Sequence, residues 1–211
     1  MLETKTVREY VDQLGSSEPT PGGGSVAGLC AALGSALNCM VFSLTVDKKI
    51  YKELPEAEKN LVDEHYSNSM KLKDEFMELM NKDAEVFGKF IEIFKLPKDT
   101  EEEKKIRNDK LEEGFKEALQ IPLKTLEKSE VLYEYILTAA KYGSKGVISD
   151  AAAAVIMLHA ALESSIINIK INLKGIKDQE FKNLILEKCS KIESLVTPKK
   201  AEIIRIVEER M

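Results

Sequence analysis

Residues 19–46 read PTPGGGSVAGLCAALGSALNCMVFSLTV, which is 28 consecutive positions without one charged side chain. The run is long enough for a helix to cross a bilayer. It begins with two prolines, however, and contains five glycines and polar residues such as Asn38, which suit a lipid-facing helix poorly. We therefore interpret the run as a helix buried in a helical bundle, extending from about Ser25 to Lys49.

Two stripes run along this expected helix at helical spacing. The bulky stripe is Val26, Leu29, Leu33, Leu37, Met40 and Leu44, and the small stripe is Ser25, Gly28, Ala32, Ser35 and Cys39. Small residues three and four positions apart let a second helix approach closely, either within the protomer or across a dimer. Because it has two packing faces, the helix is predicted to be central to the fold.

Helical periodicity dominates the rest of the chain as well. Capping boxes at Thr6–Glu9 and Thr100–Glu103 predict two helix starts, and Asp178 is a third candidate cap. A further helix is expected to begin at Pro55 and to run to about Leu96. The sequence thus predicts an all-α, multi-helix up-and-down bundle in which residues 1–211 form one domain.

Proline and serine define the expected boundaries in the second half of the chain. Pro122 either kinks its helix or begins a successor, and Pro198 is expected to separate a short terminal helix. Ser149 is the expected N-cap of a helix that begins at Asp150. Residues 167–172 alternate with period two, so a short strand competes with helix there, and we favour the helix.

Composition excludes several classes of function. A net charge of −5 and a pI near 5.4 argue against nucleic acid as the main partner. The first five residues contain no apolar signal region, so a cytoplasmic location is expected. No metal site is predicted, because the three cysteines lack metal-ligand spacing and His65 and His159 are isolated.

The main anomaly in the apolar pattern is Asp83. It occupies the inward stripe of its expected helix, between Met80 and Phe87, where a charge costs several kcal/mol unless it is paired or faces a ligand. The alternative is a stripe that rotates outward locally and leaves Asp83 in solvent. Because the apolar periodicity resumes on both sides, we favour a functional carboxylate.

The glycines at 22–24 predict a turn whose bare backbone N–H groups could cradle an anionic or carbonyl-bearing ligand; a plain loop-to-helix turn is the alternative. Lys48 and Asp150 each have two interpretations. Either the charge stabilises the dipole at the end of its helix, or the side chain binds a ligand. Asn168 and Asn172 share one helix face and need hydrogen-bond partners, from either a neighbouring helix or a ligand.

Several segments resemble a known family in their order and spacing. They are residues 19–27, 44–51, 83–87, 118–122, 149–150 and 171–178. Together they resemble the cyclodeaminase/cyclohydrolase family of folate enzymes, which includes bacterial methenyltetrahydrofolate cyclohydrolase and the C-terminal domain of formiminotransferase-cyclodeaminase. The resemblance covers nearly the whole chain.

The resemblance implies a homodimeric enzyme of one-carbon metabolism. Its expected substrate is a folate, mono- or polyglutamylated, with no cofactor beyond the tetrahydrofolate substrate and no nucleic-acid or membrane partner. The first expectation is hydrolysis of 5,10-methenyltetrahydrofolate to 10-formyltetrahydrofolate, which the lack of a fused transferase domain favours. The alternatives are formiminotetrahydrofolate cyclodeaminase, which releases ammonia, and a catalytically inactive helical folate-binding scaffold.

The matched segments suggest which residues carry this chemistry. Asp83 and Asp150 are the catalytic candidates, because a carboxylate near the cationic methenyl carbon would stabilise it and act as base toward water. The substrate-binding candidates are Pro21, Gly22, Gly23, Gly24, Ser25, Lys48, Ser149 and Asn172. The chain departs from the family pattern at Asp47, where glycine is expected, and at residues 143–146, which replace an asparagine-containing turn.

Overall fold

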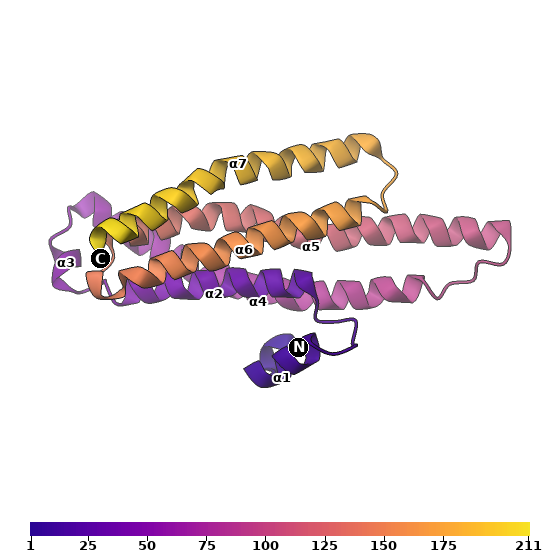
Figure 1. Cartoon of the computed structure of the whole chain (residues 1–211), viewed down its shortest axis with the longest axis horizontal. Coiled ribbons are helices and arrows are strands. Elements are labelled where there is room, and N and C mark those ends of the chain that lie inside the picture. Colours follow the sequence, from indigo (N-terminus) through magenta and orange to yellow (C-terminus); the bar gives the residue numbers. More distant parts are fainter.

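A computed structural model describes the whole chain, residues 1–211, as a bundle of α-helices without β-strands (Figure 1). The α-helices are α1 (Val7–Leu14), α2 (Gly23–Ser43), α3 (Lys49–Lys52), α4 (Glu56–Ile93), α5 (Glu101–Tyr142), α6 (Ile148–Leu173) and α7 (Gln179–Arg210), with the short 3₁₀ helices η1 (Leu2–Thr4) and η2 (Lys145–Val147). The five long helices lie side by side and alternate in direction, which confirms the predicted all-α bundle.

The small stripe of α2 packs inside the bundle, against α4 and close to α6. A Cβ added at Gly28 would lie 2.9 Å from the Met80 backbone nitrogen, so α2 and α4 touch almost backbone to backbone. Ser35 strengthens this contact, because its hydroxyl donates to the Ser69 carbonyl oxygen at 2.7 Å. Gly34 allows an equally close approach to α6, where an added Cβ would lie 2.9 Å from the Ala154 carbonyl oxygen. The close helix approach predicted from the sequence therefore occurs within the protomer.

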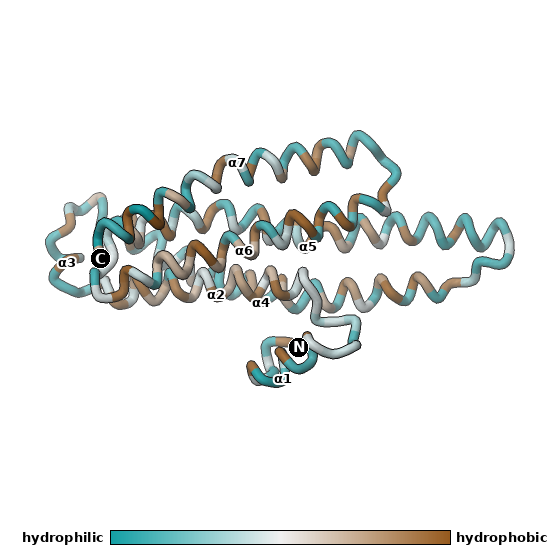
Figure 2. The backbone as a smooth tube through the Cα atoms, viewed as in Figure 1, coloured by the Kyte–Doolittle hydropathy of each residue, from teal (hydrophilic) through white to brown (hydrophobic).

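Much of the bulky stripe of α2 lies outside the bundle, although Leu37 is partly buried against the core. Leu33 and Met40 expose 45% and 44% of their surface, and Leu44 is also exposed. Only one of the two predicted packing faces is thus buried in a single chain. In Figure 2 most of α2 is pale or brown, in contrast to the teal stretches of α4 and α5.

Both capping boxes and the Asp178 cap form as predicted, with Asp178 accepting a hydrogen bond from the Phe181 amide. The predicted cap at Ser149 is wrong. Helix α6 begins two residues earlier than predicted, at Ile148, because the 3₁₀ turn η2 leads directly into it and places Val147 at the N-cap without a side-chain bond. Residues 167–172 are helical, as favoured over the strand.

Two prolines lie inside helices rather than between them. Pro122 lies within α5 and neither ends it nor begins a successor. Pro198 lies within α7, so the expected separate terminal helix is wrong. Buried side chains on both sides of Pro198, Val196 and Ile203, hold both halves of α7 against the core and offset the missing hydrogen bond.

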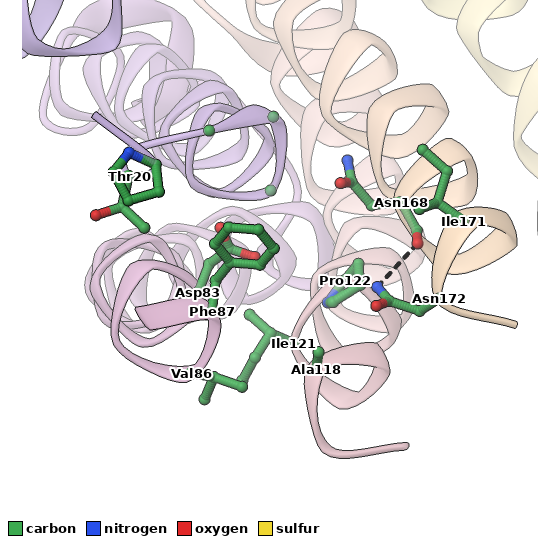
Figure 3. A pocket seen from close by; sticks show the side chains of 14 residues that line it. Thr20, Asp83, Val86, Phe87, Ala118, Ile121, Pro122, Asn168, Ile171 and Asn172 are labelled. Atoms are coloured by element: carbon green, nitrogen blue, oxygen red, sulfur yellow. Dashed lines mark hydrogen bonds between the residues drawn. The ribbon is translucent and has the colours of Figure 1, made fainter. Parts of the chain in front are cut away.

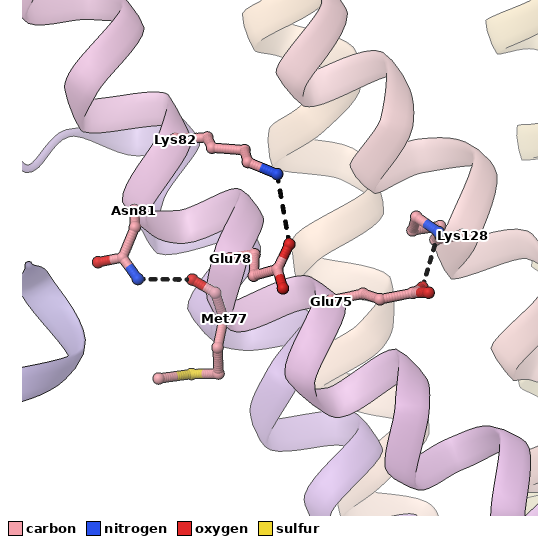
Figure 4. Close-up of polar contacts among 6 residues, drawn as sticks. All are labelled: Glu75, Met77, Glu78, Asn81, Lys82 and Lys128. Carbon is pink, nitrogen blue, oxygen red and sulfur yellow. Dashed lines mark hydrogen bonds and ion pairs between the residues drawn. The ribbon is translucent and has the colours of Figure 1, made fainter.

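The surfaces of α4 and α5 are charged along much of their length. Figure 4 shows Lys128 of α5 paired with Glu75 of α4 at 2.7 Å, and Lys82 paired with Glu78 at 3.3 Å within α4. Asn81, on the same helix, accepts a hydrogen bond from the Leu2 amide at 2.7 Å and anchors the N-terminus. The charged, water-facing surface of α4 therefore lies beside the uncharged helix α2.

By length and composition alone, the segments Gly23–Ser43 and Lys145–Leu173 could each cross a membrane. Their apolar windows are 56% and 50% buried within the bundle. Core helices of bundles pass the same test, so the two segments are weak evidence for a membrane span.

Candidate active site

A cleft of about 200 Å³ lies where α2 begins. The glycine turn forms one side, and α4, α5 and the C-terminal half of α6 form the others (Figure 3). The lining residues are Pro19, Thr20, Gly22, Gly23, Gly24, Asp83, Val86, Phe87, Ala118, Ile121, Pro122, Asn168, Ile171 and Asn172. Four segments that are far apart in the sequence thus converge on one small space.

Asp83 is the only charged residue that lines this cleft. Its Oδ2 accepts a hydrogen bond from the Ser25 hydroxyl at 3.0 Å. A Cβ at Gly24 would overlap the carboxylate, so glycine is required there for space. Helix α2 begins at Gly23, and its positive N-terminal end faces the acid.

The surroundings of Asp83 shift its protonation equilibrium. Burial raises the pKa of the Asp83 carboxyl above its ordinary value, and hydrogen bonds from Ser25 lower it and offset part of this effect. The cleft contains no lysine or arginine that would hold the group ionised. A desolvated carboxylate with a raised pKa is well suited to accept a proton or to stabilise a cationic ligand.

Asn168 and Asn172 bring acceptor groups to the opposite wall. The Asn168 side-chain NH₂ donates to the Ser164 carbonyl at 2.8 Å, and that of Asn172 donates to the Asn168 carbonyl at 3.0 Å (Figure 3). Each amide group therefore turns one N–H back onto its own helix, which leaves its side-chain oxygen as an acceptor and its second N–H as a donor. Together with Asp83, the two oxygens suit a ligand that presents N–H donors or positive charge.

Apolar residues form the remaining wall. Phe87 is partly exposed and lies near Pro122 and Ile121 in Figure 3, with Val86 below. Flat apolar surface of this kind accommodates an aromatic ring. All four residues fall in segments that carried the family resemblance, but nothing in the residue types alone identified them as site residues.

The structure brings together some of the predicted site residues and separates others. Gly22, Gly23, Gly24, Asp83 and Asn172 line the cleft. Ser25 supports it through Asp83, and the buried Pro21 precedes the turn after a cis peptide bond. Asn168 also lines the cleft; the sequence left open whether its partner is a neighbouring helix or a ligand.

Lys48, Ser149 and Asp150 lie at the other end of the bundle. There the Ser144 amide donates to the Thr45 hydroxyl at 2.8 Å, which joins the α5–α6 connection to the segment after α2. The 21 residues of α2 separate this end from the cleft by about 31 Å. A single chain therefore does not unite these three residues with Asp83, and their roles remain predictions.

Residues 1–211 contain no group of three or more His, Cys, Asp or Glu side chains arranged to hold a metal ion. The three cysteines are unpaired, and burial raises the pKa of each thiol. None of them lines the cleft.

Comparisons with known proteins converge on one group. Residues 6–191 match the family model described as formiminotransferase-cyclodeaminase. The methenyltetrahydrofolate cyclohydrolase of Methylorubrum extorquens is 34% identical over 208 residues, which are 99% of this chain and 97% of that protein. The formimidoyltransferase-cyclodeaminase of Gallus gallus is 30% identical over 99% of this chain, but the match covers only 38% of that longer protein.

A solved structure agrees with the sequence matches. The crystal structure of formiminotetrahydrofolate cyclodeaminase from Thermotoga maritima superposes with a TM-score of 0.85 at 26% identity. The match covers 99% of this chain and 98% of that one.

Proposed function

The chain belongs to the formiminotransferase-cyclodeaminase family, and we propose that it is a methenyltetrahydrofolate cyclohydrolase, which hydrolyses 5,10-methenyltetrahydrofolate to 10-formyltetrahydrofolate. The similarity to the Methylorubrum extorquens cyclohydrolase along almost the whole of both chains supports this assignment. The observation that carries it is the single desolvated carboxylate, Asp83, in a cleft without any other charge.

Asp83 is the proposed general base. The methenyl carbon of the substrate bears positive charge shared with N5 and N10, and the carboxylate stabilises that charge. A water oxygen bonds to this carbon while Asp83 takes one of the water protons. The hydroxyl on the resulting tetrahedral carbon then loses its proton as the C=O double bond forms, and the bond from the carbon to N5 breaks. N5 takes the proton held by Asp83, and the formyl group stays on N10. Overall, water is consumed and one proton is released.

The cleft walls fit the rest of the substrate. The side-chain oxygens of Asn168 and Asn172 accept hydrogen bonds from N–H groups of the pterin edge, and Phe87 and Pro122 contact a ring. The glycine turn contributes backbone N–H groups toward a carbonyl or developing oxyanion.

A cyclodeaminase activity is the second candidate, favoured by the structural match to the formiminotetrahydrofolate cyclodeaminase of Thermotoga maritima. In that reaction N10 attacks the formimino carbon of 5-formiminotetrahydrofolate and ammonia leaves. Both reactions pass through a tetrahedral carbon at the same place, so Asp83 serves either. A catalytically inactive folate-binding scaffold is the remaining alternative, motivated by the departures at Asp47 and residues 143–146.

We propose a cytoplasmic homodimer that needs no cofactor beyond the tetrahydrofolate substrate and has no nucleic-acid or membrane partner. A net charge of −5 supports the exclusion of nucleic acid. Polyglutamylated folates are included among the proposed substrates.

The direct test mixes purified protein with 5,10-methenyltetrahydrofolate and follows the loss of its near-ultraviolet absorbance, with buffer alone as the blank. Cyclohydrolase activity predicts a faster decay that Asp83→Asn abolishes. Ammonia release from 5-formiminotetrahydrofolate, without decay of the methenyl compound, would instead identify the cyclodeaminase. Binding of either folate without turnover would identify the scaffold.

A further inference from the structure

A strip of four aromatic side chains runs from the cleft toward the far end of α4. It is called the aromatic strip below and consists of Phe87, Phe90 and Phe94 of α4 with Phe115 of α5. The rings form one connected cluster, in which the centroid of Phe90 lies 4.7 to 6.2 Å from the other three centroids. Because Phe87 also lines the cleft, the strip begins inside the candidate active site.

The aromatic strip lies where α4 and α5 continue without the other helices. In Figure 1 the end of α4 and the beginning of α5 extend past the ends of α2 and α6. Phe87 and Phe94 expose 41% and 47% of their surface there. Phe90, between them, is buried against Gly114 of α5, where an added Cβ would lie 2.6 Å from the Phe90 ring. Two exposed rings on a fixed third ring offer a flat apolar surface to a ligand that extends out of the cleft.

The strip and Asp83 share one face of α4. The three phenylalanines of α4 follow Asp83 by 4, 7 and 11 positions, which is the spacing of a single helical stripe. Eleven residues of α-helix span about 17 Å. The facing side of α5 has the same spacing, because Arg107 precedes the cleft residue Ala118 by 11 positions. One seam between the two helices therefore leads from the acid to Arg107.

Arg107 lies at the outer end of the strip. Its guanidinium carbon is 5.8 Å from the centroid of the Phe94 ring. Its Nε is buried, and no group of the chain accepts a hydrogen bond from this atom. The neighbouring cations Lys95 and Lys104 are paired with glutamates, whereas Arg107 is not. A guanidinium that is held against a ring and has free N–H groups is well suited to bind a carboxylate.

The acid best placed to neutralise Arg107 is engaged elsewhere. Glu103 lies four positions before Arg107 on α5, the spacing at which an ion pair on a helix is favoured. Its carboxylate instead accepts hydrogen bonds from the backbone amides of Asp99 and Thr100, both at 3.0 Å, at the capping box. The charge of Arg107 is therefore available to an anion from outside the chain.

We propose that Arg107 binds a carboxylate of the glutamate of the folate substrate, while the aminobenzoyl ring lies on the aromatic strip. The proposal rests on the proposed function, because it places the remaining part of the same substrate. With the methenyl carbon beside Asp83, the arm from N10 to the outer carboxylate extends about 12 Å at ordinary bond lengths. The protein side chains and the closing hydrogen bonds cover the rest of the distance of about 17 Å.

This arrangement accounts for the charge of the substrate tail. The cleft itself contains no lysine or arginine, although the glutamate of a folate carries two carboxylates. The planar fork of Arg107 can hold one of them through two parallel hydrogen bonds. The cation is also kept away from Asp83, so it does not lower the basicity of the proposed catalytic acid.

The test crosses two substrates with two forms of the chain. The wild type and Arg107→Gln are assayed with 5,10-methenyltetrahydrofolate and with an analogue in which a neutral methylamide replaces the glutamate. Arg107→Gln should raise the KM for the folate about 10–100-fold, the loss expected for a charge-assisted pair, with kcat unchanged. The KM for the methylamide should be the same in both forms, because this compound has no carboxylate for Arg107 to hold.

Two further variants separate recognition from folding. Lys105→Gln removes the same charge from the opposite side of α5, two residues away, and should leave both KM values unchanged. Arg107→Lys keeps the charge but loses the planar fork, so its KM for the folate should lie between those of the wild type and Arg107→Gln. Urea denaturation should give all three variants a midpoint close to that of the wild type.

A wild-type KM of Arg107→Gln for the folate would overturn the proposal. An equal rise of KM for both compounds would overturn it as well, since that result indicates a distorted cleft and not a lost carboxylate contact. A wild-type chain that turns over neither methenyltetrahydrofolate nor 5-formiminotetrahydrofolate would instead refute the proposed function. Calorimetry with 5-formyltetrahydrofolate and its methylamide analogue then decides the tail site alone, because only Kd for the former should rise in Arg107→Gln.

Discussion

The α-carbon of Gly24 lies directly against the carboxylate of Asp83, so close that a methyl group at position 24 would overlap it. The first turn of α2 and the C-terminal third of α4 thus meet at the acid. The glycine-rich turn has a definite steric purpose at Gly24, whereas a Cβ at Gly22 would meet nothing within 4 Å.

Gly24→Ala should displace Asp83 and reduce kcat. A misplacement of about 1 Å at a catalytic group costs roughly 10²-fold in rate, and overpacking costs about 1–3 kcal/mol of stability. Gly88→Ala is the control, because it lies in open space five residues further along α4 and should stabilise the helix by about 0.5–1 kcal/mol. Steady-state kinetics and urea denaturation measure both effects. Wild-type kcat in Gly24→Ala would show that the acid's position does not matter.

Asp83→Asn should lower turnover by roughly 10²–10⁴-fold, because it removes the base while keeping the volume. Its effect on stability depends on pH. The folded-state pKa is raised, so the carboxyl of the wild type favours folding below its unfolded pKa of about 3.9, and this contribution is lost as pH rises through the folded pKa. At neutral pH the Asn variant should be at least as stable as the wild type. A variant clearly less stable at neutral pH would indicate a structural role.

Ser25→Ala should move the acidic limb of the kcat/KM profile to higher pH. The Ser25 hydroxyl donates to the Asp83 carboxylate at 3.0 Å and lowers its pKa, which burial raises. Without this donor, a more basic solution is needed to ionise the acid. Rates measured from pH 4 to 9 would show the displaced limb, and an unchanged limb would mean that another group controls it.

Asp47→Gly should stabilise the protein. Asp47 is the one non-glycine residue with a positive φ, 65°, in the left-handed region where side chains other than glycine are strained. Glycine there should add about 0.5–1 kcal/mol, whereas Asp47→Ala should destabilise, since aspartate tolerates this conformation better than alanine. Thermal unfolding of both variants checks the order. The family's expected glycine at this position thus has a conformational cause.

Sequence reasoning was most successful where local chemistry decides the outcome. The Thr6 and Thr100 capping boxes depend on residues three positions apart, and both form. Asp83 stood out because one acid interrupts an apolar stripe. Prediction from the sequence failed where packing between distant residues overrides local preference. Pro198 is the example, because its buried neighbours keep it inside α7.

Two aspects of the site could not be read from one chain's pattern. The bulky stripe of α2 looks the same whether its partner helix belongs to the same chain or another, and the structure places Leu33 outside the bundle. Periodicity likewise gives the face of Asn168 but not what lies opposite it. That depends on how α2 and α6 are aligned, which the contact between Gly23 and Asn168 reveals.

Pro122, inside α5, has a consequence for how the cleft can change in evolution. A proline has no N–H, so the bond that a regular helix would make to the carbonyl of Ala118, four residues earlier, is missing. Both residues line the cleft, so the carbonyl that lacks its helical donor belongs to a residue of the cleft wall. No replacement of the side chain at 118 can delete that oxygen. One part of the cleft's preference for donor groups is therefore inherited with the backbone and shielded from most point mutations.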